Sequence, residues 1–140
     1  MDNTERMQQT DNAWNSRDWD TFKKRHAENV AVYWPAQEEP TRGREPHHLE
    51  SVEFCKTYPD NRVKNDPYDI IFGQGDWTCM VTRFTGTMTG PMKTPEGEIP
   101  PTNKAFDVEF CTVAHWQNGE IVEEKLFFDV VGLMKQLGLG

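Results

Sequence analysis

The chain has 140 residues, near the commonest size of a single domain, and a domain of this length buries about two-thirds of the surface of its unfolded chain. Its hydrophobic content of 36% includes five Trp and eight Phe, which suits a core or a pocket built from a few large rings. The formal charge is −8, from 23 acidic and 15 basic residues, and no basic cluster is longer than residues 23–25. Nucleic acids and anionic membranes bind positive surfaces, so we expect neither as a partner. We expect one domain over residues 1–140.

The cysteines and the first residues indicate the compartment. Cys55, Cys79 and Cys111 form no CxxC motif, and an odd number cannot pair fully within one chain. Residues 1–5 are polar and acidic, unlike a signal peptide, and no apolar run approaches the roughly 18 residues of a membrane span. We therefore expect reduced cysteines and a cytoplasmic protein.

Helical patterns dominate the first half of the chain. Residues 3–15 have helical spacing with Asn3 or Thr4 as the cap, and Asp18 can cap a second short helix. A β-branched and aromatic stretch at 30–34 predicts a strand. A third helix is expected from Pro46 to about residue 57, because Pro suits a first helical turn.

The second half has the two-residue period of strands. Four stretches show it: residues 68–72, 77–89, 105–116 and 121–128. Asn118-Gly119 is a strong hairpin signal, and residues 130–137 can form a short helix. Residues 90–104 predict a long loop, either a lid or a plain excursion.

Helices followed by antiparallel strands predict an α+β fold, in which three N-terminal helices pack on one face of a curved antiparallel sheet. No GxGxxG or GxxxxGK[ST] motif indicates a nucleotide-binding sheet.

Asp129 is the first candidate for acid/base chemistry. If Asn118-Gly119 is a two-residue turn, Phe110 lies opposite Phe127, and Asp129 shares their face. A carboxyl beside aromatic rings loses hydration, which raises its pKa toward neutrality. A β-bulge would reverse this facing. Asp129 could equally cap the helix that begins at Val130.

The histidines are weaker candidates. His48 lies on the helical arc of Val52 and Cys55, where a structural role is commoner than a catalytic one, and His115 lies near the hairpin turn as a second-rank acid/base group. His47 and His48 are adjacent and cannot both bind one metal, and neither belongs to a two-histidine zinc pattern such as HExxH. We expect no metal site.

Further candidates are judged by their chemical surroundings. Glu123 and Glu124 lie beside Lys125, which favours solvated strand positions. Five aromatic residues are candidates for the lining of a pocket: Trp14, Tyr33, Trp34, Phe110 and Phe127.

The hairpins also predict an oligomer. Large apolar residues fall on both of their faces, Phe110 and Phe127 on one, Val113, Leu126 and Phe128 on the other. One face can line the pocket and the other needs cover, for which we expect a homodimer.

Longer motifs carry a family resemblance. Residues 119–124 (GEIVEE) followed by 129–138 (DVVGLMKQLG) resemble the C-terminal signature of the SnoaL-like polyketide cyclases. Further landmarks follow in the family's order: Arg42-Gly43-Arg44, Pro59-Asp60, Gly75-Asp76, residues 86–90 (GTMTG) and Pro100-Pro101-Thr102.

The resemblance implies the nuclear-transport-factor-two-like cone fold, in which the curved antiparallel sheet and the three N-terminal helices form a cone-shaped barrel around a deep pocket. It implies a cofactor-free intramolecular aldol ring closure on a hydrophobic, polyketide-like ligand. It also implies that Asp129 is the general base. Met88 stands where the family often has His, and Phe127 stands where a polar partner would help to hold an enolate. The same superfamily contains isomerases, dehydratases, hydrolases and non-catalytic binding modules, so the fold does not decide the reaction.

Overall fold

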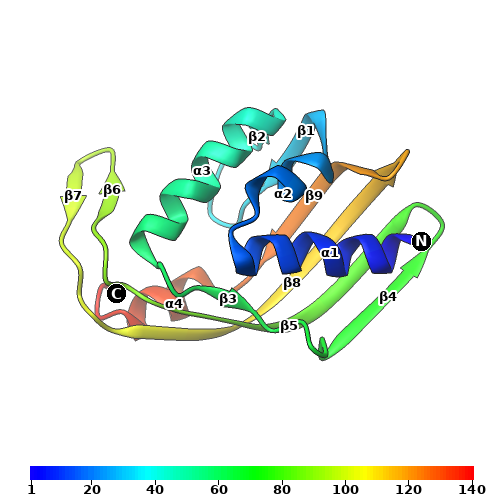
Figure 1. Cartoon of the computed structure of the whole chain (residues 1–140). Helices are drawn as coiled ribbons and strands as arrows, with labels where there is room; N and C mark the ends of the chain where they lie inside the picture. The colour runs from blue at the N-terminus through cyan, green and yellow to red at the C-terminus, as the bar shows by residue number, and fades with distance from the viewer.

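Three helices lie together on one face of a seven-stranded sheet (Figure 1). The computed structural model describes all 140 residues. The helices are α1 (Asn3–Ser16), α2 (Trp19–Lys24), α3 (Arg44–Thr57) and α4 (Val130–Gln136). The strands are β1 (His26–Tyr33), β2 (Thr41–Arg42), β3 (Arg62–Val63), β4 (Ile70–Gln74), β5 (Trp77–Thr87), β6 (Met92–Thr94), β7 (Gly97–Ile99), β8 (Ala105–Gln117) and β9 (Glu120–Phe127). The α+β prediction is confirmed.

The sheet is mixed and mostly antiparallel, with one parallel pair that the sequence did not predict. Its strand order is β2-β1-β9-β8-β5-β3, and β4 pairs with the first half of β5, residues 77–81. β1 runs parallel to β9, and the other pairs are antiparallel. A parallel pair requires a long connection between its strands, and α3 with the strands up to β8 supplies it between β1 and β9.

Acidic caps set where the first helices begin. Asp18 accepts a hydrogen bond from the Thr21 amide at 3.2 Å, as expected. The cap of α1 is Asp2, which accepts from the Glu5 amide at 2.9 Å, and not Asn3 or Thr4. α1 ends at Arg17, whose φ of 60° is left-handed. The turn directs the chain into α2, so that both helices cover the same part of the sheet.

The hairpin of β8 and β9 contains a bulge that overturns the predicted register. Gln117 pairs with Glu120 as expected, but the pairing shifts beyond Trp116, and Phe127 lies opposite Cys111. One extra residue on one strand reverses which side chains face inward. Phe110 is therefore buried, whereas Phe127 is 51% exposed on the outer face.

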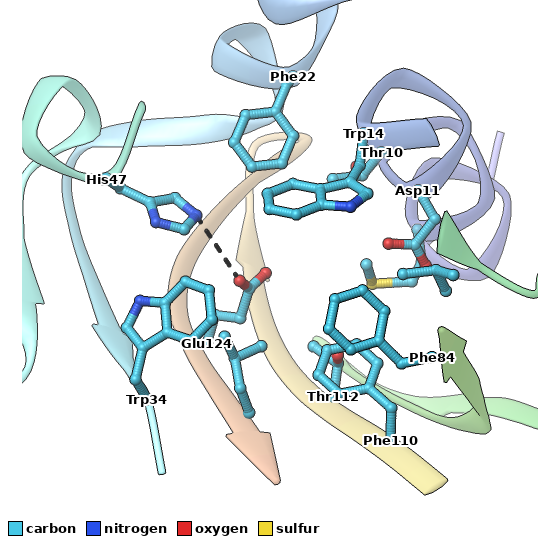
Figure 2. A pocket seen from close by; sticks show the side chains of 13 residues that line it. Thr10, Asp11, Trp14, Phe22, Trp34, His47, Phe84, Phe110, Thr112 and Glu124 are labelled. Atoms are coloured by element: carbon cyan, nitrogen blue, oxygen red, sulfur yellow. Dashed lines mark ion pairs between the residues drawn. The ribbon is translucent and has the colours of Figure 1, made fainter. Parts of the chain in front are cut away.

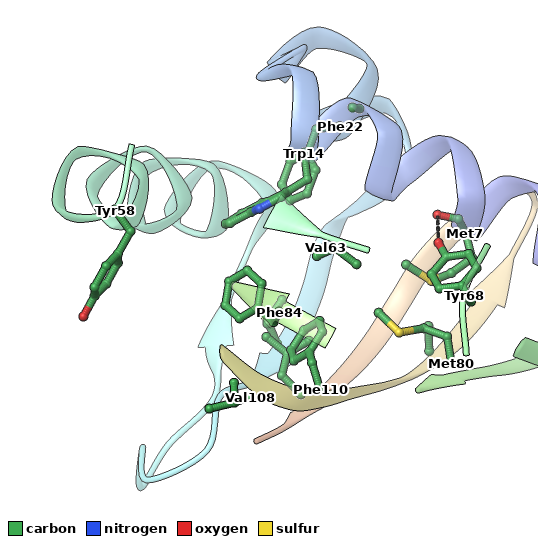
Figure 3. Close-up of a cluster of buried hydrophobic side chains, with 14 of the residues drawn as sticks. Met7, Trp14, Phe22, Tyr58, Val63, Tyr68, Met80, Phe84, Val108 and Phe110 are labelled. Carbon is green, nitrogen blue, oxygen red and sulfur yellow. Dashed lines mark hydrogen bonds between the residues drawn. The ribbon is translucent and has the colours of Figure 1, made fainter. Parts of the chain in front are cut away.

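The core lies between the helices and the inner sheet face (Figure 3). Trp14 of α1 and Phe22 of α2 pack toward Phe84 and Phe110 of the sheet, and Met7 and Tyr68 meet at the other end of the cluster. No helix is long and apolar enough to cross a membrane.

Residues 90–104 contain a small hairpin, β6 and β7, that extends beyond the end of α3 (Figure 1). Gly90 at its base lies against the end of α3 and donates its amide to the Thr57 carbonyl at 3.0 Å. A Cβ atom at Gly90 would lie 1.9 Å from the Lys56 carbonyl oxygen. The close approach fixes the base of the hairpin on α3.

Gly90→Ala should destabilise the fold, because the backbone of α3 and the hairpin base must separate to admit the methyl group. We expect a loss of about 1–3 kcal/mol in the free energy of unfolding, measured by urea denaturation. Gly75→Asn is the control, since position 75 has a left-handed φ of 59° that Asn tolerates, and a Cβ atom there would meet no other atom within 4 Å. Equal stability of Gly90→Ala and the wild type would contradict the packing.

Candidate active site

A cavity lies between the three N-terminal helices and the inner sheet face (Figure 2). Thirteen residues line it, eight of them hydrophobic, and the rings of Trp14, Phe22, Trp34, Phe84 and Phe110 form much of the wall. Its volume of about 50 Å³ has room for a few water molecules. The five lining residues that are not hydrophobic are Thr10, Asp11, His47, Thr112 and Glu124.

Asp11 is the polar group of the α1 wall. It lies on the helix face of Met7 and Trp14, is 7% exposed, and projects into the cavity (Figure 2). The Tyr68 hydroxyl donates a hydrogen bond to its Oδ2 at 2.5 Å. Burial raises the pKa of Asp11 to about 7, assisted by the charge of Glu124 and opposed by Tyr68 and His26. A carboxyl with this pKa can take up and release protons near neutral pH.

Glu124 and two histidines form the opposite wall. Glu124 Oε1 lies 3.9 Å from His47 Nε2, and its Oε2 lies 3.8 Å from His26 Nε2. All three residues are buried. Burial by itself raises the pKa of Glu124, but the neighbouring imidazoles of His26 and then His47 hold it below its usual value. The two carboxyls of the cavity are thus shifted in opposite directions.

A chain of hydrogen bonds links this wall to an adjoining groove of about 350 Å³. Glu50 Oε2 accepts from His47 Nδ1 at 2.8 Å and from Trp34 Nε1 at 2.7 Å. Glu50 lines the groove, and Trp34 lines both the groove and the cavity. The Trp34 indole therefore forms part of the boundary between them.

The predicted pocket aromatics divide into two groups. Trp14, Trp34 and Phe110 line the cavity. Tyr33 lies at the surface, where Lys125 Nζ approaches its ring at 5.1 Å, and Phe127 is on the outer sheet face. Tyr33 follows the buried Val32, and Phe127 follows the buried Leu126. Successive side chains of a strand point to opposite faces, so Tyr33 and Phe127 point outward.

Asp129 does not lie in the cavity, and its predicted position there is wrong. It is exposed, and its Oδ1 accepts from the Gly132 amide at 2.9 Å as the N-cap of α4. The alternative role as a helix cap, which the sequence left open, is the one that the structure shows. The β9 bulge and the end of the strand before Asp129 account for the difference.

The predicted histidines also lie elsewhere. His48 Nδ1 lies 3.1 Å from Glu45 Oε1, and its ring packs against Trp19 of α2 with ring centroids 5.6 Å apart. His115 stacks on Trp77 across the outer sheet face, with ring centroids 4.4 Å apart. Neither lines the cavity.

The sequence interpretation missed the polar residues that do line the cavity. Asp11 has a recognisable signal, because it sits four residues after Met7 and three before Trp14, on an apolar helical face. Glu124 was expected in solvent, but it lies two residues before Leu126 and therefore on the same, buried face of β9. His47 was weighed only against its sequence neighbours.

Asp11→Asn should change how stability depends on pH. The pKa of Asp11 is higher in the folded than in the unfolded state, so the folded chain binds more protons between about pH 4 and 7, and wild-type stability falls as pH rises through that window. Asn cannot ionise. Around Asp11 the titrating groups are Tyr68, Glu124 and His26.

The free energy of unfolding of the Asn variant, relative to that of the wild type, should rise by on the order of a few kcal/mol from pH 5 to pH 8. Urea denaturation at each pH measures this difference. Tyr68→Phe removes the hydrogen bond that lowers this pKa, and should extend the wild-type fall to higher pH. Parallel curves for the wild type and Asp11→Asn would contradict the ionisation of a buried Asp11.

Comparison with known proteins identifies the family. The model of the SnoaL-like polyketide cyclases matches residues 4–137. No curated protein matches the chain.

Solved structures share the fold at low identity. A proposed polyketide cyclase from Pseudomonas putida KT2440 has a TM-score of 0.83 at 15% identity, covering 98% of both chains. A proposed SnoaL-like polyketide cyclase from Jannaschia sp. CCS1 has a TM-score of 0.81 at 18% identity, covering 96% of this chain and 89% of that one. IdmH from Streptomyces antibioticus, a proposed polyketide cyclase, has a TM-score of 0.77 at 23% identity, covering 96% of both. The chain has the nuclear-transport-factor-two-like fold and belongs to the SnoaL-like polyketide cyclase family.

Proposed function

We propose that the protein closes a ring in a hydrophobic, polyketide-like ketone by an intramolecular aldol reaction, with Asp11 as the general base. The observation that carries this proposal is a buried carboxyl that projects into an aromatic cavity in a member of this family. The hydrogen bond from Tyr68 engages Oδ2, which leaves Oδ1 for the substrate. Asp11 thus replaces Asp129, which the sequence favoured and which caps α4 at the surface.

The proposed reaction needs one group that moves a proton. The Asp11 carboxylate removes a proton from the carbon beside a ketone, and the resulting enolate carbon attacks a second carbonyl carbon of the same molecule. A carbon–carbon bond forms, and the attacked oxygen takes the proton back from Asp11 as a hydroxyl. General acid/base catalysis of this type contributes about 10²- to 10⁴-fold. No organic cofactor has a role in these steps.

The cavity must enlarge to admit such a substrate. Its present volume of about 50 Å³ holds waters only, but the adjoining groove of about 350 Å³ shares Trp34 as a wall. Rotation of the Trp34 side chain would break its hydrogen bond to Glu50 and join the two spaces. Planar rings could then stack on the aromatic residues that line both.

Turnover separates Asp11 from Asp129. The assay follows ring closure of a linear polyketide-like triketone. Asp11→Asn should lower kcat/KM by about 100-fold or more, because the amide cannot accept the proton. In the wild type, kcat/KM should rise with pH through about 7, where Asp11 ionises.

Asp129→Asn is the matched control, since it removes an equal charge from the surface and keeps a capping oxygen. It should retain wild-type turnover. Full activity of Asp11→Asn would exclude Asp11 as the base. Tight ligand binding without turnover in the wild type would favour a binding module.

We also propose that the protein forms a homodimer through the outer face of its sheet. Phe72, Trp77 and Phe127 are 57%, 42% and 51% exposed there. Cys79 pairs with Phe72 and Val113, and Cys111 pairs with Phe127, so these residues lie on one continuous face. An exposed apolar face of this kind favours burial against a second copy.

Phe127→Glu should convert the dimer to a monomer in sedimentation velocity measurements, because the charge cannot be buried without a partner. Leu49→Glu is the control, since Leu49 is 57% exposed on α3, on the other side of the molecule. A wild-type protein that sediments as a monomer would refute the dimer.

A further inference from the structure

Two histidines and a glutamate from distant parts of the chain meet beside the cavity. His26 begins β1, His47 lies in the second turn of α3, and Glu124 lies in the middle of β9. One ligand atom from each, an imidazole nitrogen or a carboxylate oxygen, lies within 4.8 Å of the other two. The exposed fractions are 1%, 2% and 5%. Figure 2 shows the His47 ring pointing at the Glu124 carboxylate.

The second nitrogen of each ring fixes its tautomer. His26 Nδ1 lies 2.7 Å from the Phe22 carbonyl oxygen, which can only accept, so Nδ1 carries the proton. His47 Nδ1 donates in the same way to the Glu50 carboxylate at 2.8 Å. In its neutral form, each ring therefore presents a lone pair at Nε2. Both Nε2 atoms are buried and have no hydrogen-bond partner.

The distances favour a cation over a direct hydrogen bond. A charged imidazole and a carboxylate in hydrogen bond lie about 2.7–2.9 Å apart, but here the two gaps are 3.8 and 3.9 Å. Ligands at about 2.0–2.1 Å from a tetrahedral metal lie about 3.3 Å from each other. The two measured pairs would need to close by about half an ångström, and the widest separation in the cluster, up to 4.8 Å, by about 1.5 Å, which side-chain rotation can supply.

We propose that His26 Nε2, His47 Nε2 and the Glu124 carboxylate bind one divalent transition-metal ion of the Zn²⁺ type. Two imidazoles and one carboxylate are a common ligand set for these ions, and three protein ligands leave a position for water or substrate. That position faces the cavity, because His47 and Glu124 both line it. The contacts of Phe22 and Glu50 orient the two rings as outer-shell partners of metal-bound histidines do.

This site departs from the sequence expectation, which considered only ligands one helical turn apart. The binding itself does not depend on the proposed function. One consequence does rest on it: a cation opposite Asp11 would stabilise the enolate oxygen, the role for which the sequence offered no polar partner.

Cobalt provides a test that needs no substrate. The purified full chain is treated with EDTA, desalted and titrated with Co²⁺ in a spectrophotometer, and with Zn²⁺ by calorimetry. We expect one equivalent per chain, visible absorption bands of four- or five-coordinate Co²⁺, and a higher Tm with Zn²⁺. A stripped chain that shows neither the bands nor the binding heat would overturn the proposal.

Variants locate the ion. His47→Ala should abolish the cobalt bands, whereas His48→Ala removes a neighbouring histidine of the same helix and should leave them unchanged. Equal losses in both variants, or bands that persist in His47→Ala, would place the ion elsewhere and refute the site.

A milder variant covers the case in which His47→Ala does not fold, judged by circular dichroism. Glu50→Gln keeps all three ligands, removes the charge that orients His47, and should weaken binding by about 10- to 100-fold. Unchanged affinity in Glu50→Gln would contradict the orientation argument. Metal binding with full turnover in Asp11→Asn would refute the proposed base and leave the metal site standing.

Discussion

Glu124 is a carboxylate inside an aromatic core, and a buried charge is stable only with partners that compensate its lost hydration. His26 and His47 approach it from β1 and α3, so one charged group ties the central strand β9 to a neighbouring strand and a helix. Glu50 and the Phe22 carbonyl then fix the outer nitrogens of both rings. The arrangement of the helices over the sheet depends on this polar network as well as on the apolar contacts around it.

Asp11 shows the opposite consequence of burial. Its side-chain hydrogen bond comes from the Tyr68 hydroxyl, and this bond and the charge of His26 do not outweigh burial, so the pKa of Asp11 rises to about 7 while that of Glu124 falls below its usual value. Two carboxyls in one cavity with pKa values shifted apart are suited to different tasks. Asp11 can exchange a proton near neutral pH, and the Glu124 carboxylate can stabilise a cation beside it.

Trp34 connects this chemistry to the surface. Its indole forms a wall of both the cavity and the groove, and its hydrogen bond to Glu50 makes the wall part of the network that orients His47. A substrate that displaces Trp34 would therefore also alter the hydrogen bond between His47 and Glu50. Access to the cavity and the state of the His–Glu wall are physically coupled.

Four features are predictable from the sequence, because each depends on neighbours within a few residues: the α+β class, the cap at Asp18, the turn at Asn118-Gly119 and the family signature. It also contained the signal of Asp11 on an apolar helical face. The position of Asp129 as the cap of α4, outside the cavity, could not be predicted in this way, since one extra residue in β9 reverses the pleat and no local pattern reveals a bulge. The His–Glu cluster was equally hidden, because its members come from a strand, a helix and a second strand that meet only when the parallel pair β1–β9 forms under α3.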